Sequence, residues 1–133
     1  MKRYVYYQPN KLDLKDNYCD CTIRALSKVL GCSWLEAYDK MVPICRKYQA
    51  PNIFNLSLKV EQEAMKELGN FEYTGVSNAK GTKRPTVAEF AKAHPTGRYI
   101  LNVANHEVAV VDGQYFDTWD SGRCSLYGYY ELR

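Results

Sequence analysis

The sequence predicts an α+β fold in which N-terminal helices pack on a C-terminal antiparallel sheet. Apolar residues recur at helical spacing between Cys21 and Leu68, and from Arg98 onward they alternate with period two. Asp112-Gly113, between two alternating runs, is the strongest hairpin signal in the chain. Helices followed by strands in this order are typical of α+β proteins. We expect residues 1–133 to form a single domain, since this length suits one core.

The first predicted elements are a strand and a buried helix. Residues 3–9 are aromatic and β-branched and end at a proline, which favours a short strand. Residues 21–30 have helical apolar spacing and are followed by Gly31, a C-terminal stop. Asp20 is the expected N-cap, which places Cys21 in the first turn. We expect Arg24 and Asp20 to be capping or surface charges.

Two further helices are predicted before residue 70. Ser33 and Glu36 have capping-box spacing at the start of a helix that runs to about residue 48. A third helix covers about residues 57–68 and stops at Gly69. The expected buried stripe of the second helix consists of Leu35, Tyr38, Met41, Val42 and Cys45.

The second half of the chain reads as a loop, a short helix and a sheet. Residues 74–85 are small, polar and basic, which indicates a surface connector or a substrate lid. A short helix follows Thr86 and ends near residue 93. The alternating strands are predicted at residues 98–104, 106–111, 114–119 and 126–130.

Composition excludes several function classes. The net charge of +3 comes without a basic stripe interleaved with aromatics, so we expect no nucleic-acid partner. No run approaches the roughly 20 apolar residues of a membrane helix, and the N-terminus has no signal-type apolar run, so we expect a cytoplasmic protein without membrane contact. Five cysteines form no disulfide pattern, which indicates reduced thiols. We take Cys32, Cys45 and Cys124 as packing residues.

The hairpin predicts a histidine–carboxylate pair. A two-residue turn at Asp112-Gly113 places His106 opposite Trp119 and Val108 opposite Asp117, all on one face. Asp117 is then the diagonal neighbour of His106, at a Cα separation of about 7–8 Å that the two side chains can span. Asp120 faces the other way. Trp119 is either a core aromatic or a shield over the His106–Asp117 hydrogen bond.

Cys21 can supply the nucleophile for such a pair. A thiol in the first turn of a helix experiences the positive end of the macrodipole, and a neighbouring imidazolium lowers its pKa further. Cys19 is the rival nucleophile, but it precedes the helix. A zinc site formed by Cys19, Cys21 and His106 is an alternative, although no second Cys or His pair completes the usual ligand set. We therefore expect no metal and no cofactor.

Two motifs together resemble a known family. Asp20-Cys21-x-x-Arg24-Ala25-Leu26, with His106 to Gly113 and Asp117-Thr118-Trp119-Asp120 far downstream, resembles small papain-like cysteine peptidase-fold proteins, including many encoded by bacteriophages. The Asp117-Thr118-Trp119 run is similar to the Asn-Ser-Trp run of papain-type enzymes. The resemblance implies a papain-like fold with Cys21 as nucleophile, His106 as base and Asp117 as orienting residue.

One departure from the family pattern affects the expected activity. Papain-type enzymes carry an oxyanion-hole Gln six residues before the cysteine, where this chain has Lys15. Gln8, Asn10 and Asn17 are the amide side chains that can substitute, and we favour Asn17 because it is nearest. The first hypothesis is a thiol-dependent hydrolase of peptide, isopeptide or other amide bonds. The alternative is a non-catalytic binding module, such as a phage protein acting on a host factor.

Overall fold

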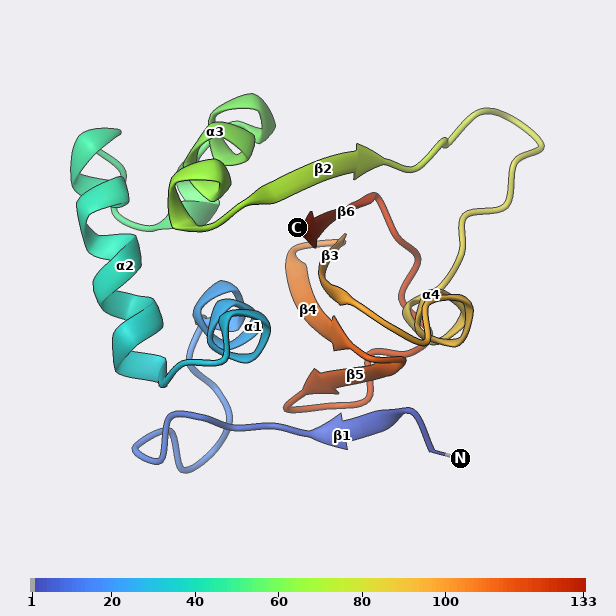
Figure 1. The fold of residues 1–133 in the computed structure, drawn as a ribbon, viewed down its shortest axis with the longest axis horizontal. Helices are drawn as coiled ribbons and strands as arrows, with labels where there is room; N and C mark the ends of the chain where they lie inside the picture. Colours follow the sequence, from blue (N-terminus) through green and yellow to red (C-terminus); the bar gives the residue numbers. More distant parts are fainter. Residues whose placement is uncertain (1) are drawn as a thin grey trace.

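The computed structural model describes residues 2–133 and contains a six-stranded sheet with helices on both faces (Figure 1). In chain order the elements are β1 (Tyr4–Tyr6), α1 (Cys21–Leu30), α2 (Trp34–Lys47), the 3-10 helix η1 (Ile53–Asn55), α3 (Leu58–Leu68), β2 (Phe71–Gly75), α4 (Val87–Ala93), β3 (Arg98–Val103), β4 (His106–Val111), β5 (Gln114–Asp117) and β6 (Gly128–Leu132).

The sheet has the strand order β1-β5-β4-β3-β6-β2. All neighbouring strands are antiparallel except β1 and β5, which are parallel. The predicted α+β class is therefore confirmed. The prediction of a purely C-terminal antiparallel sheet is wrong, because β1 near the N-terminus and β2 from the middle of the chain form its two edges, and β1 is parallel to β5. β2 was not predicted, and its last residues, Thr74 and Gly75, were assigned to the loop.

Helix α1 has the bounds that the sequence predicts, and Gly31 ends it with a positive φ of 69°. The capping box of α2 is present at Ser33 and Glu36. Its predicted buried stripe is confirmed only at Met41, because the other buried residues are Ala37 and Ile44. Apolar residues occupy two flanks of α2, and the flank with the small Ala37 is the one packed inward, which leaves Leu35, Tyr38 and Val42 exposed.

Strands β3 and β4 are buried on both faces. Ile100 and Ala109 belong to the apolar cluster shared with α1, α2 and α3, whereas Leu101 and Val110 belong to the cluster shared with α4. In Figure 1, α1 to α3 lie on one side of the sheet and α4 lies on the other. This double cover explains why both phases of the period-two pattern are apolar.

The hairpin between β4 and β5 has the predicted register. Val111 pairs with Gln114 and Ala109 pairs with Phe116, and the turn residues Asp112 and Gly113 have φ values of 48° and 81°. The ladder is shorter than predicted, since β5 ends at Asp117 and the chain turns at the next residues. This early end matters for the site, because it leaves Asp117 at the mouth of the hairpin beside the first residue of β4.

None of the helices within residues 2–133 is long and apolar enough to cross a membrane.

Candidate functional site

A pocket of about 490 Å³ opens where the N-terminus of α1 meets the start of β4 and the end of β5. The residues that line it are Asp16, Asn17, Tyr18, Cys19, Cys21, Arg24, Phe54, Asn105, His106, Thr118 and Trp119. Both predicted reactive side chains, Cys21 and His106, are in this set. The predicted nucleophile and the predicted base therefore line the same pocket.

His106 and Asp117 form the predicted pair. The His106 Nε2 lies 2.6 Å from the Asp117 Oδ2, and the Asp117 side chain is only 1% exposed. An ionised carboxylate only accepts hydrogen bonds, so the contact assigns the ring proton to Nε2. Nδ1 is then the nitrogen that can accept a proton from another group.

Three neighbours hold Asp117 in place. Thr118 donates its backbone N–H to Oδ1 at 2.8 Å, and the Ser121 hydroxyl donates to Oδ2 at 2.7 Å. Strand β1 fixes the backbone, because the Tyr7 N–H donates to the Asp117 carbonyl at 2.9 Å. The orienting carboxylate is thus anchored by both ends of the chain, which sequence patterns could not have indicated for Ser121 or β1.

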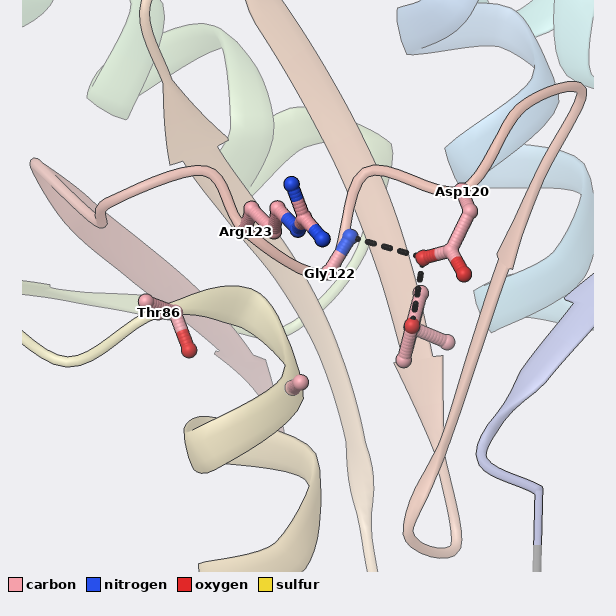
Figure 2. A pocket seen from close by; sticks show the side chains of 6 residues that line it. Thr86, Asp120, Gly122 and Arg123 are labelled. Atoms are coloured by element: carbon pink, nitrogen blue, oxygen red, sulfur yellow. Dashed lines mark hydrogen bonds between the residues drawn. The ribbon is translucent and has the colours of Figure 1, made fainter.

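Asp120 faces away from His106, as the register predicts. Its Oδ1 accepts the Tyr115 hydroxyl at 2.6 Å and the Gly122 N–H at 3.0 Å, and these bonds lower the pKa of Asp120. Figure 2 shows this carboxylate bonded to Gly122 in a second pocket, with Thr86 and Arg123 nearby. The Asp120 carboxylate therefore bonds to Tyr115 and Gly122, and not to His106.

Cys21 is the first residue of α1 and is only 7% exposed. The pKa of its thiol is raised to about 12, mainly by burial and also by the charge of Glu107, while the Glu107 backbone N–H and Arg24 act in the opposite direction. The expectation of a lowered thiol pKa is contradicted, because desolvation is the largest influence on this pKa and it acts upward. Within residues 2–133, the His106 ring bonds to Asp117, and no hydrogen bond joins it to the Cys21 thiol.

Cys19 is exposed and lines the same pocket just before α1. It lacks the position in the first turn that Cys21 has. The zinc alternative has no structural support, since no group of three or more His, Cys, Asp or Glu side chains in the described part of the chain could hold a metal ion.

Glu107 is a buried carboxyl next to the site that the sequence reading did not single out. It follows His106 on β4, points to the opposite face, and accepts the Thr22 hydroxyl of α1 at 2.5 Å. Its Oε2 is buried without a hydrogen-bond partner, and burial raises the pKa of Glu107 to about 8. A lone acidic residue inside the apolar run of β4 was the signal that could have found it.

Asp20 and Arg24 are buried rather than surface charges, with side chains 6% and 8% exposed. They form an ion pair with each other, and the Trp34 indole N–H donates to the second Asp20 oxygen at 2.8 Å. Asp20 occupies the N-cap position of α1 but makes no side-chain cap. Its carboxylate bonds to Arg24 and Trp34 instead.

The side chains predicted for the oxyanion hole lie in different places. Asn17 lines the pocket and is exposed. Gln8 is not a lining residue, because its amide N–H groups donate to Asp13 and Asp16 in the loop before α1. Asp20, the N-cap residue of α1, makes no side-chain hydrogen bond to the N–H groups of the first turn.

Trp119 lies against the His106 ring, with ring centroids 5.0 Å apart, and is 48% exposed. It is therefore not a core aromatic. It lies at the pocket wall beyond the end of β5, and its shielding of the His106–Asp117 bond stays a prediction.

No family model, curated protein or solved structure matches the chain.

Proposed function

We propose that the protein is a thiol-dependent hydrolase of papain-like fold that cleaves a peptide, isopeptide or other amide bond. The observation that carries the proposal is the 2.6 Å bond between His106 and Asp117 in a pocket that also contains Cys21 at the start of α1. A base oriented by a carboxylate, next to a thiol at a helix N-terminus, is the arrangement that nucleophilic acyl transfer requires.

The reaction begins with a proton transfer. Cys21 gives its thiol proton to the free Nδ1 of His106, and the thiolate attacks the carbonyl carbon of the substrate. The oxyanion that forms is stabilised by first-turn N–H groups of α1 and by the Asn17 amide. His106 then protonates the leaving amine as the C–N bond breaks, which leaves a thioester on Cys21. Water attacks this thioester with His106 as base, which releases the acid and restores the thiol.

The burial of the Cys21 thiol restricts how the thiolate can form. Because burial raises the pKa of Cys21 to about 12, the thiolate forms only as an ion pair with the imidazolium of His106. The two side chains must therefore approach when substrate binds. Tyr18, Phe54 and Trp119, each about half exposed at the pocket, offer apolar surface for the side chains of a peptide or protein substrate.

Site-resolved alkylation tests the proposal. In a Cys19→Ser background, trypsin releases residues 16–24 with Cys21 as the single thiol, so mass spectrometry reports the iodoacetamide rate of that residue. We expect His106→Gln to slow Cys21 alkylation at pH 7 by at least about tenfold. Cys32, which lies at the other end of α1, is the internal control and keeps its rate. Equal Cys21 rates in the two proteins would refute the hydrolase.

The second candidate is a non-catalytic binding module, and the buried thiol of Cys21 is the observation that favours it. A panel of peptide and isopeptide substrates separates the two. Cleavage that is lost in Cys21→Ser eliminates the binding module. Absence of cleavage, together with alkylation that is independent of His106, favours it.

A further inference from the structure

The Arg24 guanidinium lies between two buried carboxylates. Its NH1 pairs with Asp20, and its NH2 lies 3.5 Å from the Asp117 Oδ1. The side chains of all three residues are less than 10% exposed. Burying three charges is costly unless each is paired, so an arrangement like this fixes the positions of its members closely.

The same cluster extends to both sides of Arg24. Asp117 bonds to His106 through its other oxygen, and Asp20 bonds to Trp34 at the start of α2. A continuous series of polar contacts therefore runs from α2, through the first turns of α1, to the ring of His106. Arg24 is the link between the two helices and the hairpin.

The charge of the cluster depends on His106. Asp20 and Asp117 are negative and Arg24 is positive, so the cluster carries one net negative charge that a protonated His106 neutralises. Charges interact strongly where water is excluded, so removing any charged member of this cluster changes the charge that the His106 ring experiences. The other ionisable side chains that face the pair are Asp16, Tyr18, Cys19 and Cys21 at the pocket, and Tyr4 and Cys124 behind Asp117.

We propose that Arg24 is a positioning residue that acts through Asp117: it shares the Asp117 carboxylate with His106 and sets the charge balance of the pair. Its importance for catalysis rests on the proposed hydrolase function. The arrangement itself can be measured without any activity, because the protonation of His106 reports it directly.

NMR titration of the two histidine rings tests the inference. Arg24→Gln removes a positive charge near His106, so we expect its titration midpoint to rise by at least about half a pH unit. Arg24→Lys keeps the charge, so we expect the smaller shift of the two variants. His94, whose Nδ1 bonds to the Phe90 carbonyl in α4, is the internal control and keeps its midpoint. Arg98→Gln is the matched variant, because the Arg98 guanidinium bonds to the Lys28 and Val29 carbonyls at the far end of α1, so its loss should leave His106 unchanged.

Asp20→Asn tests the same cluster with a change of charge of the opposite sign. Unlike Arg24→Gln, it does not leave two buried carboxylates without a positive partner. It removes a negative charge, so the His106 midpoint should fall. An unchanged or lower midpoint in Arg24→Gln overturns the inference. If Arg24→Gln does not fold, an unchanged midpoint in Asp20→Asn overturns it and a lower midpoint supports it. The two proposals can fail separately. If the midpoints shift with the expected signs but the rate of Cys21 alkylation is the same with and without His106, the hydrolase is refuted and the role of Arg24 stands.

Discussion

His106 has one ring nitrogen bonded to Asp117 and one nitrogen free, and Trp119 covers part of the ring. A hydrogen bond to a charged group is stronger where water is excluded. We therefore expect the indole to strengthen the contact between His106 and Asp117. The half-exposed position of Trp119 means that this contribution can be tested with little disturbance of the core.

Replacing Trp119 should weaken the base without unfolding the protein. We expect Trp119→Ala to slow Cys21 alkylation at pH 7 by roughly threefold to tenfold, because water then competes for the His106–Asp117 bond. The free energy of unfolding should change by less than about 1 kcal/mol, since the side chain is half exposed. Trp119→Phe is the control and should stay near the parent rate. Equal rates for the Ala and Phe variants would contradict the shielding role.

At the scale of elements, α1 and the β4–β5 hairpin bring the reactive groups together. α1 presents Cys21 and Arg24 at the pocket, and the hairpin presents His106, with Asp117 buried behind it. The relative position of the hairpin residues depends on the turn at Asp112-Gly113. A slip of one residue would move Asp117 to the other face of the sheet.

Gly113 should therefore matter for both stability and the site. Its φ is 81°, and an added Cβ would meet the Pro95 Cα at 3.3 Å. We expect Gly113→Ala to lower the free energy of unfolding by about 1–3 kcal/mol, and to slow the His106-dependent alkylation of Cys21.

Gly81→Ala is the matched control for this change. Gly81 has a similar φ of 84° but open space around it, in the loop after β2. Its substitution should cost about 1 kcal/mol and leave alkylation unchanged. Chemical denaturation and site-resolved alkylation measure both effects. Equal losses of stability with unchanged alkylation in both variants would show that the turn does not control the site.

At the scale of the whole molecule, two buried glutamates lie between the sheet and its helices. Glu107 bonds to Thr22 of α1, and Glu61 of α3 accepts the Tyr130 hydroxyl of β6 at 2.6 Å. Burial and the charge of Glu61 raise the pKa of Glu107 from 4.5 to about 8. The packing of the helices on the sheet therefore depends on the protonation of both residues, and so on pH.

Glu107 predicts a stability that falls as pH rises. Its folded pKa lies above the unfolded value, so its contribution is fully present below about pH 4.5 and is lost up to about pH 8. The limiting slope is about 1.4 kcal/mol per pH unit. We expect Glu107→Gln, which can still accept the Thr22 hydroxyl, to flatten the stability profile between these pH values.

Denaturant titrations at several pH values measure this slope. Glu36→Gln is the control, because the capping box lowers the pKa of Glu36 and its effect therefore falls on the acid side of pH 4.5. A Glu107→Gln profile as steep as that of the parent would contradict the assignment.

The sequence alone determined the features that depend on neighbours along the chain. The bounds of α1, the capping boxes, and the β4–β5 register follow from periodicity and turn chemistry, which act over a few residues. Because the register follows from the turn, the contact between His106 and Asp117 could also be predicted. The same local reasoning favoured Asn17 over Gln8 by its distance along the chain.

Only the tertiary structure decided what depends on distant segments. The parallel addition of β1, the inward flank of α2, and the burial of Cys21 all require partners that local patterns do not specify. Desolvation is the main example, since the thiol pKa rises because of what surrounds α1 and not because of the sequence of α1. Arg24 reads as a surface charge for the same reason, and becomes the link to Asp117 only when α1 packs beside the hairpin.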